Sequence, residues 1–257
     1  MILIYKAIIP FKSKKELRYG WVTSSLMHGL IMEHIDTDYA EQIHSQQLRV
    51  FSQAVRFENG KNYWTITTLN DEAYEKIMLP LLSMSSGEVV QKDDTLFFES
   101  AEISNTSYEK LFTKHYIYSE PSRYIKLETL TPVAFKVDGR YINIPSPFLI
   151  LSGIAKRFDK DCDIHETVYE SLFADIERNI SFSSFDLHSA SFPVERVRIP
   201  AFQGAVTLRL SGNETFCRYI NMISDYASFS GIGIKTALGM GEIRYLPQSL
   251  VKKEEIT

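Results

Sequence analysis

Residues 230–241 read Ser-Gly-Ile-Gly-Ile-Lys-Thr-Ala-Leu-Gly-Met-Gly, with a pair of glycines on either side of a short middle stretch. Glycine adopts positive φ angles at little cost and has no Cβ, so such a loop can turn successive backbone N–H groups toward a phosphate. Lys235 adds a positive charge. The stretch therefore predicts a loop that binds a polyanion. The alternative is a glycine-rich turn that lets a helix pack closely on a sheet.

Two common phosphate-binding loops do not fit this stretch. A Walker loop needs glycine directly before Lys-Ser/Thr, where this chain has Ile234, and a dinucleotide fingerprint needs glycine at position 236, which is threonine. Both loops also follow a strand and precede a helix. Here a helical pattern over residues 214–229 comes first and a strand pattern over residues 242–246 follows. The order of elements thus argues against both nucleotide-binding folds.

The first part of the chain alternates strand and helix patterns. Strands are expected at residues 1–10, 48–57, 61–68, 88–90 and 96–104, and helices at residues 13–35, 38–45 and 71–82. Ser13 and Glu16 form a capping box that predicts the start of the first helix, and Asn59-Gly60 predicts a tight hairpin. This β-helix-β-β-helix-β order is that of a ferredoxin-like unit.

The second part repeats this order less regularly. Strands are expected at residues 125–135, 181–199, 204–211 and 242–246, and helices at residues 145–158, 167–179 and 214–229. The sequence therefore predicts an α+β protein of two tandem ferredoxin-like (RRM-like) halves with a C-terminal glycine-rich loop. The expected domains are residues 1–120 and 121–257, joined around residues 105–124 and separated by a cleft.

Composition limits the classes of partner. The 257-residue chain has a formal net charge of −4, which argues against a uniformly basic surface for nucleic acid, although Lys12, Lys14, Lys15 and Arg18 are clustered in one segment. The chain has only two cysteines, which are far apart and lack metal-ligand spacing, so no disulfide, metal or other cofactor is expected. Residues 1–10 have the wrong polarity for a signal peptide and no apolar run reaches membrane-spanning length. We expect a cytoplasmic protein with no membrane partner.

The spacing Gly-apolar-Gly, five residues, Gly-apolar-Gly near the C-terminus resembles the glycine-rich loop of the Cas6 family of CRISPR repeat-processing endoribonucleases, members of the RAMP superfamily. Other stretches are similar to family segments in the same order. They are the histidine and basic-x-Phe-Ser run at residues 43–52, Thr-Pro at residues 131–132, Ile-Pro-Ser-Pro at residues 144–147 and Ala-Phe-Gln-Gly at residues 201–204. Val50 stands where proline is common in the family and Ala201 where glycine is usual.

The resemblance implies a metal-independent endoribonuclease in which the 2′-hydroxyl of the RNA attacks the adjacent phosphorus. The products would be 2′,3′-cyclic phosphate and 5′-hydroxyl ends. Histidine suits such proton transfer because its pKa of about 6.5 permits either protonation state near neutral pH. His44 matches the family's catalytic histidine. His28 falls on the apolar stripe of the first expected helix, so it is either a core histidine or an assistant in catalysis.

The partner of His44 is not identified by the sequence. Tyr39 and Arg49 are nearest, and Arg49 either holds the scissile phosphate or is a solvated strand residue. The residues assigned to RNA positioning are Gly231, Gly233, Lys235, Gly239 and Gly241.

The resemblance implies CRISPR repeat RNA in a precursor transcript as the partner. It leaves open contacts with CRISPR effector subunits and a homodimer. The alternative function is a non-catalytic RNA-binding RAMP subunit of an effector complex, in which His44 is structural. The negative net charge is also consistent with a third alternative, a ferredoxin-like scaffold protein with no RNA role.

Overall fold

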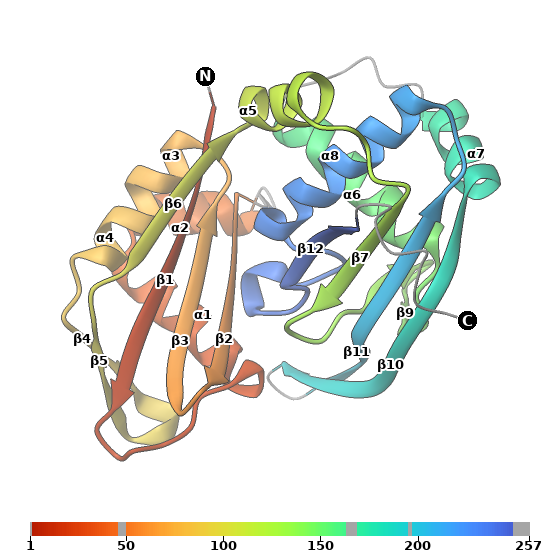
Figure 1. Ribbon diagram of the computed structural model, residues 1–257. Helices are drawn as coiled ribbons and strands as arrows, with labels where there is room; N and C mark the ends of the chain where they lie inside the picture. Colours follow the sequence, from red (N-terminus) through yellow and green to blue (C-terminus); the bar gives the residue numbers. More distant parts are fainter. Residues whose placement is uncertain (1, 46–49, 163–168, 195–196, 249–257) are drawn as a thin grey trace.

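The computed structural model describes residues 2–45, 50–162, 169–194 and 197–248. These residues contain two large antiparallel sheets, each with helices packed on one face, and one small two-stranded sheet (Figure 1). The first half contains β1 (Leu3–Ser13), η1 (Trp21–Thr23), α1 (Ser24–His34), α2 (Thr37–Ser45), β2 (Phe51–Glu58), β3 (Lys61–Thr68), α3 (Asp71–Ala73), η2 (Tyr74–Met78), α4 (Leu79–Leu82), β4 (Ser86–Val89), η3 (Val90–Lys92), β5 (Asp94–Phe98) and β6 (Glu102–Ser107). The second half contains α5 (Tyr108–Thr113), η4 (Lys114–Tyr118), β7 (Tyr124–Thr129), β8 (Phe135–Val137), β9 (Arg140–Ile142), α6 (Pro147–Asp161), α7 (Tyr169–Asn179), β10 (Ile180–Val194), β11 (Val197–Leu210), α8 (Glu214–Ser230), η5 (Thr236–Leu238) and β12 (Ile243–Gln248).

Strand order identifies the fold of each half. In the first sheet β2, β3 and β1 are neighbours, and the other edge of β1 pairs with β6 at one end and with β5 at the other. In the second sheet the order is β10-β11-β7-β12. In both cases the first strand of the unit lies between the third and the last, which is the ferredoxin-like arrangement of a β-helix-β-β-helix-β chain. The predicted fold class is confirmed.

The segment after β1 differs from its prediction. β1 continues through Pro10 to Ser13, and Glu16 has a φ of 57°, which is incompatible with the start of a right-handed helix. The Ser13 hydroxyl donates to Asp94 and accepts from the backbone N–H of Leu17. The predicted capping box is therefore wrong, because Ser13 is bound by a carboxylate from a distant strand, and the helix starts only at Ser24.

The second half also departs from its predicted boundaries. The strand expected at residues 125–135 ends at Thr129, and Phe135 starts the separate β8–β9 hairpin. The strands expected at residues 181–199 and 204–211 form one long hairpin, whose second strand starts at Val197. Residues 105–124, expected to join the halves, contain the end of β6, α5, η4 and the first residue of β7.

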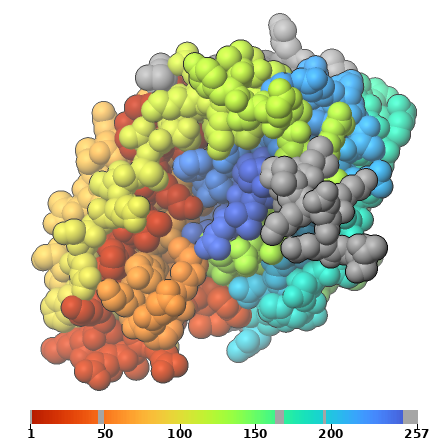
Figure 2. All heavy atoms as spheres, in the orientation of Figure 1, coloured from red at the N-terminus to blue at the C-terminus, as the bar shows by residue number. Residues whose placement is uncertain are grey.

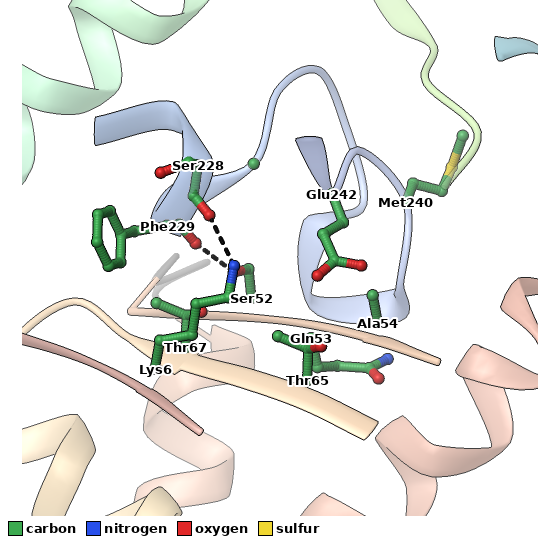
Figure 3. Close-up of a pocket in the computed structure, with 11 residues that line it drawn as sticks. Lys6, Ser52, Gln53, Ala54, Thr65, Thr67, Ser228, Phe229, Met240 and Glu242 are labelled. Atoms are coloured by element: carbon green, nitrogen blue, oxygen red, sulfur yellow. Dashed lines mark hydrogen bonds between the residues drawn. The ribbon is translucent and has the colours of Figure 1, made fainter. Parts of the chain in front are cut away.

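The halves meet at the C-terminal end of α8 (Figure 3). Lys6 of β1 donates through Nζ to the Ser228 carbonyl at 3.1 Å, and Ser52 of β2 donates through Oγ to the Phe229 carbonyl at 2.8 Å. The last carbonyls of a helix have no partner inside it, and a positive charge there is favourable. The first half thus caps the last helix of the second half.

Little space remains at this junction. The pocket lined by Lys6, Ser52, Ser228 and Glu242 has a volume of about 10 Å³, which is room for one water molecule. Figure 2 shows the two halves in broad contact rather than separated. Ile4 and Leu69 of the first half belong to the same buried apolar cluster as Ile223 and Tyr226 of α8. At this junction the halves are therefore in direct contact.

In the part of the chain that the structure describes, no helix combines the length and apolar character that crossing a membrane requires.

Candidate functional site

The glycine-rich loop, residues 231–241, connects α8 to β12 and lies against β2 of the first half (Figure 1). Gly231, Gly233, Gly239 and Gly241 all have positive φ angles, from 74° to 105°. A Cβ on Gly233 would lie 2.3 Å from the Ala134 carbonyl oxygen, and one on Gly241 would lie 2.0 Å from the Ile232 carbonyl oxygen. Conformation and close packing therefore both require glycine here.

Several backbone N–H groups of the loop are already bound within the protein. The N–H groups of Ile232, Ile234 and Gly241 donate to carbonyl oxygens at 2.9–3.0 Å. These groups tie the loop to itself and to residues 132–134. At these positions the loop is a packed turn rather than an open anion cradle. The positive charge of the loop comes from Lys235, which is exposed and has a φ of 57°.

Gln53 of β2 attaches the loop to the first half. Its Nε2 donates to the Ala237 carbonyl at 3.2 Å and to the Ser24 carbonyl at 2.9 Å, while its Oε1 accepts from Trp64 Nε1 at 3.1 Å. Gln53 is 3% exposed. Sequence reasoning missed this residue. The available signal is an amide in a predicted strand that also carries Phe51, Ala54 and Val55, which suggests a buried hydrogen-bonding role.

His28 lies on α1 beneath the loop. Its ring stacks on Phe51, with centroids 6.0 Å apart and an interplanar angle of 9°. Burial lowers the pKa of His28, a hydrogen bond to the backbone of Ala237 opposes that effect, and the charges of Lys235 and His44 lower the pKa further. His28 is therefore neutral at neutral pH. His28 is half-buried and lies against Phe51 of the first core.

His44 lies in the last turn of α2 and is exposed. His44 and Lys235 both lie within electrostatic range of His28, where each lowers its pKa. The three residues come from three different elements: α2, the glycine-rich loop and α1.

Tyr39 does not join this group. It is 1% exposed, and Lys76 Nζ lies 4.6 Å from its ring centroid. Burial, with the charge of Glu72, raises the pKa of Tyr39 to about 12, so the hydroxyl keeps its proton near neutral pH. Five residues along a helix correspond to about 140° of rotation, which places Tyr39 and His44 on different faces of α2. Arg49 lies outside the described residues.

The architecture assembled above, two tandem ferredoxin-like halves with a glycine-rich loop between the last helix and the last strand, is a fold that this chain shares with solved Cas6 structures. The family model described as CRISPR-associated endoribonuclease Cas6 matches residues 127–243. A CRISPR-associated endoribonuclease Cas6 of Mycobacterium tuberculosis is 30% identical over 226 residues, covering 86% of this chain and 71% of that protein. The chain belongs to the Cas6 family of CRISPR-associated endoribonucleases.

Other relatives agree with this assignment. A Cas6 endoribonuclease of Streptococcus thermophilus is 29% identical over 218 residues, covering 84% of this chain and 88% of that protein. Among solved structures, Thermus thermophilus Cas6 has a TM-score of 0.74 at 21% identity, covering 96% of this chain and 99% of that chain. A Cas6 product complex has a TM-score of 0.78 at 18% identity, covering 96% of this chain and 100% of that chain. These structures support the fold.

Proposed function

We propose that this chain is a metal-independent endoribonuclease that cuts within the repeats of CRISPR precursor transcripts and releases guide RNAs. The observation that carries the proposal is that His44, exposed at the end of α2, and Lys235, exposed on the glycine-rich loop, both lie within electrostatic range of His28. Family membership supports the substrate class, because the relatives named above are CRISPR-associated endoribonucleases.

The reaction needs one proton removed, one proton supplied and a negative charge neutralised. The 2′-hydroxyl attacks the adjacent phosphorus and loses its proton, the bond to the 5′-oxygen breaks, and that oxygen takes up a proton. His44 is exposed at the end of α2, so it can exchange protons with bound RNA. Lys235 is also exposed and offsets the charge that develops on the phosphorane.

His28 and the glycines have supporting roles in this proposal. Neutral His28 contacts the backbone of Ala237 and so helps to hold the loop that carries Lys235. The four glycines allow the loop to fit between residues 132–134 and Ser24. Tyr39 is buried and its raised pKa keeps the hydroxyl protonated near neutral pH, so this proposal gives it no catalytic role.

The test is a cleavage assay on repeat RNA in excess EDTA with wild type, His44→Ala and a substrate that carries one 2′-deoxy sugar at the cut site. Removing a general acid-base residue costs about 10²–10⁴-fold in rate, so His44→Ala should cut at least about 100-fold more slowly. His188→Ala is the control, because His188 is also exposed but lies on β10 of the second half.

Each result has a defined meaning. Wild-type cleavage in EDTA that yields 2′,3′-cyclic phosphate, and that is lost with His44→Ala and with the 2′-deoxy substrate, supports the proposal. Cleavage that is as fast with His44→Ala as with His188→Ala contradicts the role of His44. Wild-type protein that binds repeat RNA and never cuts it contradicts the enzymatic proposal and supports a non-catalytic RNA-binding subunit.

A further inference from the structure

A second concave surface lies at the far end of the first sheet, away from α8. It is formed by the end of β1, the segment that leads to η1, and the tip of the β2–β3 hairpin, and its volume is about 760 Å³. In Figure 2 these segments, coloured red and orange, lie next to each other at the lower left. We call this surface the hairpin pocket, and its cationic side chains are Lys12, Lys14, Arg18 and Lys61.

The hairpin pocket has an excess of positive charge. Glu16 and Glu99 are its acidic residues. Glu99 pairs with Lys12 at 2.9 Å, whereas Lys14, Arg18 and Lys61 form no ion pair within 4 Å among the residues that the structure describes. The whole chain has a net charge of −4, so this surface is a local exception. Such a patch attracts a polyanion by its local field.

The hairpin pocket also offers an aromatic ring. Phe57 at the end of β2 is 37% exposed, and the Arg18 guanidinium lies 5.1 Å from the centroid of its ring. Leu17 beside it is 38% exposed. Single-stranded RNA is bound in this way, with cations along its backbone and unstacked bases on aromatic rings and guanidinium planes. A duplex would keep its bases stacked internally and could not use the ring.

The segment that carries these residues is held in place by buried hydrogen bonds. Asp94, which is 5% exposed, accepts from the hydroxyls of Ser13 and Tyr19 and from the backbone of Lys15. Asn62 accepts from the Tyr19 N–H at 2.8 Å and donates to the Leu17 carbonyl at 3.2 Å. The pocket wall is therefore preorganised, so little entropy is lost when a ligand binds.

β2 connects the hairpin pocket to the candidate cleavage site. Phe51, at the start of this strand, stacks on His28, and Phe57 lies near its end. Six residues of extended strand span about 20 Å, a distance that a few nucleotides can bridge. We propose that the hairpin pocket binds a single-stranded segment of the same RNA that is cut at His44. This inference rests on the proposed function for the identity of the RNA, but its binding test does not require cleavage.

The first experiment measures binding of repeat RNA with its single-stranded flanks as a function of salt concentration. Lys14→Gln/Lys61→Gln is compared with wild type and with Lys92→Gln/Lys110→Gln, a pair of exposed lysines of the first half and α5 that do not line the pocket. Each phosphate contact contributes about 0.7 to the slope of log affinity against log salt for a single strand. The pocket variant should therefore bind at least about 10-fold more weakly at low salt, with a slope reduced by about 1.4.

The second experiment uses Phe57→Ala, which should weaken binding about 5-fold or more without changing the salt slope, because stacking does not release counterions. Thermal unfolding of each variant verifies folding. Affinities and slopes equal to those of the control pair would overturn the inference.

A cleavage assay distinguishes the failure of this inference from the failure of the proposed function. On a short RNA confined to the cut site, the pocket variants should cut at the wild-type rate. Loss of cleavage on that short RNA would overturn the assignment of a separate site. Protein that binds the flanked RNA through the pocket and does not cut it would support the pocket while contradicting the endoribonuclease.

Discussion

Gly239 makes a close contact between the glycine-rich loop and the first half. A Cβ at this position would lie 2.1 Å from the Cβ of Ser24 and 2.6 Å from its Oγ. Ser24 cannot move easily, because it is fully buried and its Oγ accepts from the Val55 N–H at 3.0 Å. Gly239 also has a φ of 105°, which a side chain disfavours. The position of the loop over α1 thus depends on the absence of one methyl group.

We expect Gly239→Ala to reduce the free energy of unfolding by about 1–3 kcal/mol, because it combines overpacking with an unfavourable φ. It should also slow RNA cleavage, because displacing residue 239 displaces Ala237 and Lys235. Gly153→Ala is the control, since Gly153 lies inside α6 with no atom near its missing Cβ. That variant should be unchanged or up to about 1 kcal/mol more stable. Urea unfolding and a cleavage assay measure both effects, and equal behaviour of the two variants would contradict the packing argument.

For individual residues, the sequence predicted some members of the candidate site and missed others. It selected His28, His44 and Lys235, and the last two lie within electrostatic range of His28. It also selected Tyr39 because of its closeness in sequence, although helix geometry directs that side chain into the core. It did not identify Gln53, whose importance depends on partners 29 and 184 residues away. Spacing within a short stretch of sequence therefore indicated which type of chemistry to expect. It was a poorer guide to which residues contact one another.

At the scale of elements, the segment between β1 and η1 depends on Asp94 at the start of β5. Burial by itself would raise the pKa of Asp94, but hydrogen bonds from Ser13, Tyr19 and the backbone of Lys15 outweigh it and lower the pKa below the ordinary value of 3.8. The ionised form is thus stabilised in the folded state. Such a carboxylate contributes stability above its unfolded pKa, and this contribution is lost as the pH falls through the folded pKa.

We expect Asp94→Asn to reduce the free energy of unfolding at pH 7 by about 1.5–3 kcal/mol, the usual contribution of hydrogen bonds to a charged group. Below about pH 4 wild type loses the same contribution progressively, so the difference between the two proteins should shrink. Asp93→Asn is the control, because Asp93 is exposed and its partner Lys15 is on the surface, and it should change little. Urea unfolding from pH 3 to 7 tests this, and a difference that is independent of pH would contradict it.

Elements defined by local signals were predicted well. Asn59-Gly60 forms the tight turn between β2 and β3, with φ angles of 50° and 79°. The helix expected at residues 214–229 is α8. The helix predicted from Ser13 failed, because the Ser13 hydroxyl binds a carboxylate 81 residues away instead of capping a helix. A capping pattern read from the sequence cannot account for such a competing partner.

At the scale of the whole molecule, one largely buried ion pair crosses between the halves. Arg56 of β2 lies with Nε 3.0 Å from Oε2 of Glu242, which precedes β12, and their side chains are only 12% and 8% exposed. Glu242 also acts on Lys6, whose pKa is lowered by burial although the Glu242 charge opposes this. Removing one partner of a buried pair leaves the other charge uncompensated, which costs more than losing a surface pair.

We expect Arg56→Leu to reduce the free energy of unfolding by about 3 kcal/mol, because it leaves the Glu242 carboxylate buried without its partner. Arg244→Gln is the control. It breaks the Arg244–Glu128 pair, whose side chains are 53% and 36% exposed, and should cost less than about 1 kcal/mol. Chemical denaturation of both variants measures the difference. Equal losses would show that the pair between the halves does not stabilise their contact.

The sequence by itself determined the order of the elements, the two ferredoxin-like units and the glycine-rich loop, because each depends on a pattern within a few residues. Tertiary structure alone decided that His44 and Lys235 lie within electrostatic range of His28, that Tyr39 is buried, and that several loop N–H groups bind carbonyl oxygens of the chain itself. It also shaped the hairpin pocket from segments some 40 residues apart. The physical reason is that these features depend on buried hydrogen bonds and close packing between distant segments, and no local pattern specifies which partner a polar group will find.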